Sequence, residues 1–180
     1  MSLSELAQRY RVTAGFLAGM VFLYMSEPTL RLYAIGALIS LLGIGVRFWA
    51  AGHLRKAREL TTSGPYSHTR NPLYVGSFLV LLGFALAGGS WIAGILVLGL
   101  FVIFYVPTVY REEIELRRGF PEEFERYTSQ VPRFIPRLTP YSGTTASFCL
   151  DQLVRNREYN SLIGCVIGYI MIYIKLKMPA

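Results

Sequence analysis

Five long apolar runs are the feature that most constrains this sequence; they cover residues 10–25, 32–51, 73–87, 91–109 and 162–174. A helix that crosses the hydrocarbon core of a bilayer needs about 20 mostly apolar residues, and these runs approach that length. Charged residues make up only 16% of the chain, whereas soluble domains carry about 25%. The sequence therefore predicts an all-α polytopic membrane protein with about five transmembrane helices. We expect short interfacial helices as well, and a single membrane domain over residues 1–180.

The basic residues predict how these helices are oriented. Of the 18 lysines and arginines, 14 lie in the N-terminal arm or in two connections, residues 52–72 and 110–160. The opposite connections carry three, namely Arg31, Lys175 and Lys177. Because basic loops stay in the cytosol, we expect a cytosolic N-terminus and a C-terminus on the opposite side. The net charge of +7 is interleaved with the spans, which argues against nucleic acid as a partner.

Helical periodicity continues into the long polar segment 110–160. Phe120, Phe124, Tyr127 and Val131 recur at helical spacing, with Pro121 at a favourable first position. The pattern predicts a short amphipathic helix at the membrane interface, and a second one is expected over residues 150–159. Arg47, near one end of the second run, is expected to reach the interface along its apolar stem.

The first stretch with chemical character is residues 60–74, directly before the third run. Gly64 and Pro65 indicate a turn, and Asn71 before Pro72 is a favourable helix start. Arg70 beside the free N–H groups of that helix start suits an anionic group. The simpler interpretation is a tight loop with interfacial tyrosine anchors.

The second stretch continues the fourth run into the cytosol, just after Pro107. Proline removes a helical hydrogen bond, so a kink there is expected to open space near the membrane surface. The adjacent Glu112 and Glu113 suit a cation or a ribose, and the simpler interpretation is a solvated helix end.

The sequence shows no residue pattern typical of covalent catalysis, of hydrolysis or of a metal site. His53 and His68 are interpreted as loop histidines, and the spacing of Cys149 and Cys165 is not that of a metal site. We expect no metal site. A transfer reaction that depends on positioning and electrostatics fits better.

Several short motifs in order carry a resemblance to a known family. They are Gly64-Pro65-Tyr66, Thr69-Arg70-Asn71-Pro72-Leu73-Tyr74-Val75-Gly76, Glu112-Glu113-Ile114-Glu115-Leu116, and Val131-Pro132-Arg133-Phe134-Ile135-Pro136, with Gly119, Phe124 and Tyr127 between the last two. Over about residues 30–137 the chain resembles the isoprenylcysteine carboxyl methyltransferases, which are related to the phospholipid N-methyltransferases. The resemblance implies a multi-span enzyme that uses S-adenosylmethionine, with a cytosolic cofactor pocket and a lipid or prenylated acceptor entering from the bilayer.

The resemblance also implies roles for individual residues. Arg70 would lie close to the reacting groups and Tyr74 beside it, as the catalytic pair. Glu112 would hold a polar group of the cofactor, and Tyr66 would contact the cofactor within its pocket. The remaining residues would line the approach or the cradle of the cofactor: Leu60, Thr61, Asn71, Pro72 and Leu73, together with Arg70 and Tyr74.

The sequence departs from the family pattern at three positions, and two of them, Thr108 and Gln130, concern the acceptor. The family usually has His at the position of Asn71, and its prenylcysteine-specific members have Arg at the positions of Thr108 and Gln130. A carboxylate of the isoprenylcysteine type is the first expectation and a phospholipid amine the alternative. An amine must lose a proton before it attacks, which would require a base such as His68 or Tyr74. Outside methyl transfer, a nicotinamide-dependent membrane reductase and a non-catalytic scaffold remain open.

Overall fold

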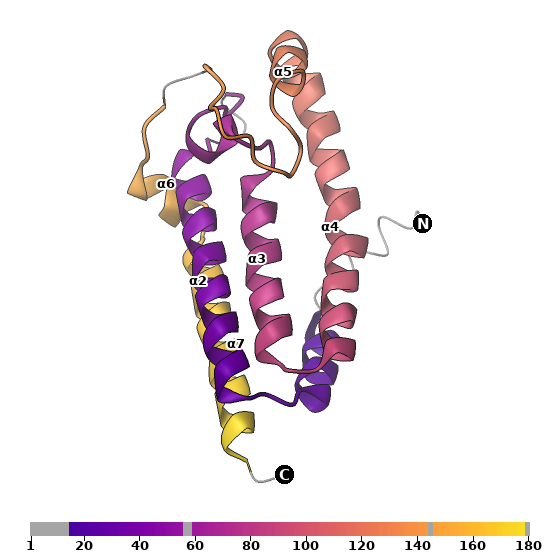
Figure 1. The fold of residues 1–180 in the computed structure, drawn as a ribbon. Coiled ribbons are helices and arrows are strands. Elements are labelled where there is room, and N and C mark those ends of the chain that lie inside the picture. The colour runs from indigo at the N-terminus through magenta and orange to yellow at the C-terminus, as the bar shows by residue number, and fades with distance from the viewer. Residues whose placement is uncertain (1–14, 56–58, 144–145, 179–180) are drawn as a thin grey trace. The chain divides into compact units, whose positions relative to one another are not determined.

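The structure is a computed structural model, and it describes residues 15–55, 59–143 and 146–178. Within these ranges the chain is helical and contains no strand. A helix over Gly15–Met25 is followed by α2 (Leu30–His53), the short 3₁₀ helix η1 (Gly64–Ser67), α3 (Pro72–Ala87), α4 (Trp91–Gly119), α5 (Pro121–Thr128), α6 (Leu150–Arg155) and α7 (Tyr159–Lys177) (Figure 1).

The apolar runs become the long helices. Helices α2, α4 and α7 are long and apolar enough to cross a membrane, whereas the helices over Gly15–Met25 and Pro72–Ala87 are shorter apolar helices. The first predicted run begins at residue 10, and its first part lies outside the described residues. The prediction of an all-α integral membrane protein is confirmed.

Helix α4 runs without interruption from Trp91 to Gly119 although Pro107 lies inside it (Figure 1). The hydroxyl of Thr108 donates a hydrogen bond to the carbonyl oxygen of Phe104 at 2.8 Å. The apolar run and the polar stretch with Glu112 and Glu113 thus belong to one helix of 29 residues.

The contacts divide the chain into two compact units. Unit 1 consists of residues 1–41, 78–108 and 164–180, and unit 2 consists of residues 42–77 and 109–163. The expectation of a single membrane domain over residues 1–180 stays a prediction.

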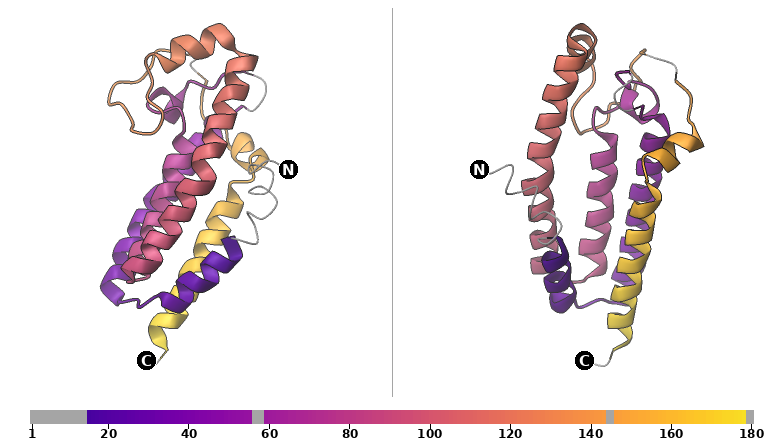
Figure 2. Two further views of the ribbon diagram at one scale, coloured as in Figure 1. Left: turned by 90° about the vertical axis from the view of Figure 1, so that its right-hand side faces the viewer. Right: turned by 180° about the vertical axis from the view of Figure 1, so that it is seen from behind.

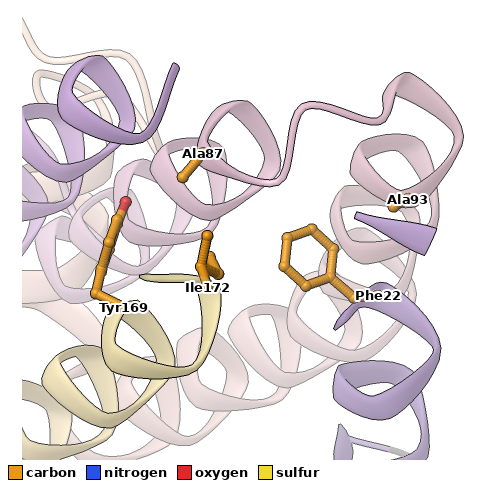
Figure 3. Close-up of a cluster of buried hydrophobic side chains, with 5 residues drawn as sticks. All are labelled: Phe22, Ala87, Ala93, Tyr169 and Ile172. Atoms are coloured by element: carbon orange, nitrogen blue, oxygen red, sulfur yellow. The ribbon is translucent and has the colours of Figure 1, made fainter. Parts of the chain in front are cut away.

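Unit 1 is held together by apolar packing and by close contacts at small residues. Phe22, Ala87, Ala93, Tyr169 and Ile172 form its buried cluster (Figure 3). A Cβ atom added at Gly83 would collide with the Ser40 side chain and the Gly36 carbonyl oxygen. Ser40 Oγ also lies 2.9 Å from the Val80 carbonyl and 2.8 Å from the Tyr169 hydroxyl. Small residues at a membrane helix interface allow such close approach.

In unit 2, Arg47 forms an ion pair with Glu158. The sequence predicts instead that Arg47 would reach the membrane interface. Its Nη2 and Nε lie 2.8 Å and 3.0 Å from Glu158 Oε2, and its Nη1 also bonds Ser77. The Arg47 side chain is 19% exposed and that of Glu158 is 9% exposed. Arg47 therefore does not reach out to the interface. A carboxylate 111 residues away in the sequence neutralises it inside the unit, as buried charges require.

Helices form over both segments for which the sequence predicts interfacial helices, and their position at a membrane interface stays a prediction. Helix α5 follows the end of α4 directly, and the chain then loops back (Figure 2). The apolar side chains of α5, Phe124 and Tyr127, are buried in a cluster with Leu60 and Val131, so they pack against protein. The second helix ends at Arg155, because Arg157 adopts a left-handed backbone with φ of 54° before α7 begins.

Candidate functional site

Three segments of unit 2 meet around the loop that precedes α3. The backbone N–H of Arg70 donates to the Pro132 carbonyl at 2.9 Å, that of Arg137 to the His68 carbonyl at 2.9 Å, and that of Tyr141 to the Ser67 carbonyl at 2.9 Å. Residues 132–141 therefore run along residues 67–70 and are fixed to them by main-chain hydrogen bonds. The C-terminal part of α4 supplies the third wall, through Glu113.

Glu113 is the centre of a buried polar network. Its carboxylate accepts hydrogen bonds from Arg133 Nη2 at 2.7 Å and from Asn71 Nδ2 at 3.1 Å. Arg70 Nε lies 3.6 Å from the same carboxylate, and the Arg133 guanidinium lies 4.2 Å from the centre of the Tyr110 ring. The hydrogen bond with Glu113 is the main cause of a raised pKa for Arg133. One carboxylate thus joins α4, the start of α3 and the segment after α5.

Arg70 is close to this carboxylate, but its Nε makes no hydrogen bond with it. Its side chain is 14% exposed, and its Nε is buried without a hydrogen bond to any residue that the structure describes. The two oxygens of Glu113 already accept hydrogen bonds from Arg133. Two guanidinium groups around one carboxylate leave a surplus positive charge, which suits an anionic group.

Asn71 occupies the residue before α3, as the sequence predicts. Its backbone carbonyl accepts hydrogen bonds from Tyr74 and Val75 N–H, each at 3.1 Å, so it begins the helix. Its amide nitrogen instead donates to Glu113 and, at 3.2 Å, to the Arg133 carbonyl. Asn71 therefore organises the network rather than facing outward.

The expected cofactor wall is buried and rigid. Leu60, Thr61 and Tyr66 are each less than a tenth exposed, and the Tyr127 hydroxyl donates to the Tyr66 carbonyl at 2.6 Å. Burial, followed by the neighbouring Tyr127 and Glu112, raises the pKa of Tyr66 well above its ordinary value. Tyr66 therefore presents a neutral phenol at neutral pH.

Glu112 and Tyr74 lie together at a more exposed place. The Tyr74 hydroxyl donates to Glu112 Oε1 at 2.7 Å. Glu112, for which the resemblance implies a contact with the cofactor, thus also has a side-chain partner. Tyr74 and Glu112 are brought together, whereas Arg70 and Asn71 gather at Glu113.

The resemblance gave no role to two residues of the network, Glu113 and Arg133, although Glu113 belongs to the acidic pair that the sequence singled out. Adjacent residues on a helix point in directions about 100° apart, so only one member of an acidic pair faces the protein. The choice between Glu112 and Glu113 needs the rotation of α4. Arg133 stood in a recognised motif, but nothing in the sequence indicated its partner.

His68 lies in the loop directly after η1, as predicted, whereas His53 is the last residue of α2 and not a loop residue. His53 Nδ1 lies 3.0 Å from the Trp49 carbonyl and His68 Nδ1 lies 2.8 Å from the Arg137 carbonyl. A ring nitrogen that faces a carbonyl oxygen donates its proton to it. Among the described residues there is no group of three or more His, Cys, Asp or Glu side chains that could hold a metal ion.

Comparisons with known proteins found a family model and several relatives that resemble this chain. The family model described as phospholipid methyltransferase matches residues 29–123. The chain is 36% identical over 119 residues to the nickel-cobalt-cadmium resistance protein NccN of Alcaligenes xylosoxydans xylosoxydans, which covers 64% of this chain and 54% of that protein. It is 39% identical over 108 residues to the cobalt-zinc-cadmium resistance protein CzcN of Cupriavidus metallidurans, covering 58% of this chain and 49% of that protein.

A third relative is named as a methyltransferase. The chain is 31% identical over 86 residues to the protein-S-isoprenylcysteine O-methyltransferase of Schizosaccharomyces pombe, covering 48% of this chain and 36% of that protein. The chain spans about half the length of the first two relatives. No solved structure matches it significantly. The family match covers more than half of the chain and includes α2, α3 and the Glu112–Glu113 pair. The chain therefore belongs to the phospholipid methyltransferase family of integral membrane proteins, to which the isoprenylcysteine methyltransferases are similar.

Proposed function

We propose that this protein is an S-adenosylmethionine-dependent membrane methyltransferase that acts on a lipid-like acceptor, first of all a carboxylate of the isoprenylcysteine type. The observation that carries the proposal is that Arg70 lacks a hydrogen-bond partner at its Nε in the described part of the chain. Its side chain is 14% exposed, and its Nε is buried. This Nε lies 3.6 Å from a carboxylate that already binds Arg133. Such a group is prepared to receive an anion.

The residues present fit this cofactor. S-adenosylmethionine has a carboxylate, an ammonium and an adenine, and when bound it supplies an electrophilic methyl group. Arg70 would hold a carboxylate with two hydrogen bonds, and Glu112 would hold a positively charged or hydroxyl group. Tyr66 would give an aromatic wall for the adenine. The buried, neutral surroundings of Tyr66 would exclude water from this wall.

A carboxylate acceptor makes fewer demands on this site than an amine. An amine acceptor must first be deprotonated, whereas a carboxylate attacks as it is. The Tyr74 hydroxyl donates to Glu112 and is therefore a protonated phenol and not a ready base, whereas His68, whose Nδ1 donates to the Arg137 carbonyl, has only its Nε2 to accept a proton. The surplus positive charge around Glu113 also favours an anionic acceptor.

The phospholipid amine stays as the second candidate, because the family model that matches residues 29–123 is described by phospholipid methylation. The two acceptors can be separated with S-adenosylmethionine that carries a radiolabelled methyl group. We expect label in a prenylcysteine product that alkali releases as methanol, since esters hydrolyse and N-methyl groups do not. Alkali-stable label in a phospholipid would instead identify an amine acceptor.

Calorimetry on the purified protein tests the activity class. We expect S-adenosylhomocysteine to bind and the reduced nicotinamide cofactor not to bind. Binding of the nicotinamide alone would overturn the proposal in favour of a membrane reductase, and binding of neither would favour a scaffold.

We further propose that the site faces the cytosol, with the N-terminus on the same side and the C-terminus opposite. The concentration of basic residues in segments 52–72 and 110–160 supports this orientation.

A further inference from the structure

The turn around η1 carries an unusual number of buried hydroxyl groups. The side chains that share this property are Thr61, Thr62, Ser63, Ser67 and Thr69. A buried hydroxyl without a hydrogen bond destabilises the folded protein, so nearly all such groups are paired. A hydrogen-bond partner is therefore expected for each of these five hydroxyl groups.

Four of the five have a partner. Thr61 Oγ1 accepts from the Arg55 N–H at 3.2 Å, Ser67 Oγ donates to the Gly64 carbonyl at 2.7 Å, and Thr69 Oγ1 donates to the Arg133 carbonyl at 3.0 Å. Thr62 also interacts with a neighbour. Ser63 Oγ alone is buried with no hydrogen bond to any residue that the structure describes, and Ser63 is only 6% exposed.

Ser63 stands at a position where a serine hydroxyl usually caps a helix. Ser63 precedes η1 with an extended backbone, φ of −93° and ψ of 165°, which is the usual geometry of an N-cap, yet its side chain makes no capping hydrogen bond. Its backbone carbonyl accepts from the Tyr66 N–H at 3.2 Å. The main chain of Ser63 is thus engaged by the turn, while its hydroxyl is not.

The turn also restrains the main chain next to Ser63. Gly64 has a φ of +58°, and a Cβ atom there would lie 2.7 Å from the His53 ring. Only glycine fits this close approach and this backbone angle. Pro65 follows, and the Tyr127 hydroxyl donates to the Tyr66 carbonyl. The main chain that carries the Ser63 hydroxyl is therefore held in place, which limits the reorganisation that a ligand contact would require.

We propose that Ser63 Oγ is a hydrogen-bonding contact for the polar part of the S-adenosylmethionine cofactor, in the same turn as Tyr66. This inference rests on the proposed function. It assigns a role to a residue that neither the sequence motifs nor the ion network had singled out. It also explains why the turn keeps a hydroxyl that contributes nothing to its own folding.

The test measures cofactor affinity and unliganded stability in the same variants of the full-length protein. Ser63→Ala should raise the dissociation constant of S-adenosylhomocysteine about tenfold by calorimetry, the effect of one lost hydrogen bond. The same change should leave the unliganded melting temperature equal or slightly higher, because it removes an unpaired buried hydroxyl. Ser63→Cys keeps the shape of the side chain but has a larger sulfur atom, and its weak S–H donor should give the same direction of change in affinity.

Ser67→Ala is the matched control, since its hydroxyl is paired within the turn; it should lower the unliganded melting temperature. Wild-type affinity in both Ser63 variants would overturn the inference and would mean that water satisfies the hydroxyl. A lower melting temperature in Ser63→Ala would also overturn it, because the hydroxyl would then serve the fold. Failure of the wild-type protein to bind S-adenosylhomocysteine would overturn the proposed function and this inference together.

Discussion

At the scale of single residues, two adjacent glutamates on α4 have opposite surroundings. Glu113 is 8% exposed and is contacted by Arg133 and Asn71, with Arg70 nearby. Glu112 is exposed and accepts one hydrogen bond from Tyr74. The two positions should therefore respond differently to the same substitution.

Glu113→Gln should destabilise the protein by about 3 kcal/mol, because two arginines lose their shared countercharge inside the protein. Glu112→Gln should leave the melting temperature unchanged, since the glutamine oxygen still accepts from Tyr74. It should weaken the binding of S-adenosylhomocysteine by about ten- to a hundred-fold, which corresponds to ~1.5–3 kcal/mol for a charge-assisted hydrogen bond. Thermal unfolding and calorimetry on the purified variants measure both effects.

Glu115→Gln is the control for a general effect of charge, because Glu115 is 69% exposed and lies 4.0 Å from Arg111. An equal loss of affinity in Glu115→Gln would remove the specific role of Glu112. A fully stable Glu113→Gln protein would contradict the structural role of the network.

Arg70→Lys tests the group that carries the proposed function. Lysine keeps the positive charge but cannot bind a carboxylate with two parallel hydrogen bonds. We expect the variant to insert into the membrane and to bind S-adenosylhomocysteine, while its turnover falls about a hundred-fold through a loss of ~3 kcal/mol of positioning. Initial rates of methyl transfer at saturating substrate measure the effect.

Arg55→Lys is the matched substitution in the same connection, because Arg55 is 38% exposed and pairs only loosely with Glu59 at 3.3 Å. Its rate should equal that of the wild type. Equal rates for Arg70→Lys and the wild type would reduce Arg70 to a structural residue and would remove the main support for the mechanism.

At the scale of helices, the packing of α2 on α3 in unit 1 depends on glycine. A side chain at Gly83 would collide with Ser40 and with the Gly36 carbonyl oxygen. Gly83→Ala should therefore lower the melting temperature in detergent by several degrees, as a forced separation of packed helices costs about 1–3 kcal/mol. Gly99→Ala is the control, since nothing lies within 4 Å of a Cβ atom there, and its melting temperature should not fall. Equal stability of both variants would show that the helices do not pack this closely.

The ion pair between α2 and the start of α7 can be examined with a double-mutant cycle. Arg47→Met alone and Glu158→Leu alone should each cost about 3 kcal/mol, because each leaves a buried charge without its partner. The double variant should recover most of the stability, since no unpaired charge remains. Thermal unfolding of the four proteins gives the coupling energy. Additive losses in the double variant would mean that the pair contributes no specific interaction.

At the scale of the whole molecule, the orientation in the membrane can be measured by cysteine accessibility. Cysteines at Glu59 and Glu122, in a background without Cys149 and Cys165, should react with an impermeant reagent from one side. A cysteine at Glu27, whose backbone N–H bonds the Gly88 carbonyl at 2.7 Å, should react from the other. Labelling of Glu59 and Glu122 from opposite sides would refute the proposed topology.

Features that depend on neighbouring residues can be predicted from the sequence, whereas features that depend on residues far apart in the chain require the tertiary structure. Hydrophobicity and helix-start signals are local, so the sequence by itself determined the all-α membrane class, the start of α3 at Pro72 and the helix that begins at Pro121. The family resemblance extended this to the stretch around Arg70 and Tyr74. Tertiary structure alone decided which glutamate of the pair is buried, because that depends on the rotation of α4.

The tertiary structure also decided the partners of the charged residues. Arg47 meets Glu158 at a separation of 111 residues, and Arg133 meets Glu113 at a separation of 20. No local pattern encodes such pairs, since a side chain finds its partner only after the helices have packed and excluded water from both charges. The unpaired hydroxyl of Ser63 belongs to the same class, because it can be recognised only when every neighbour has been placed.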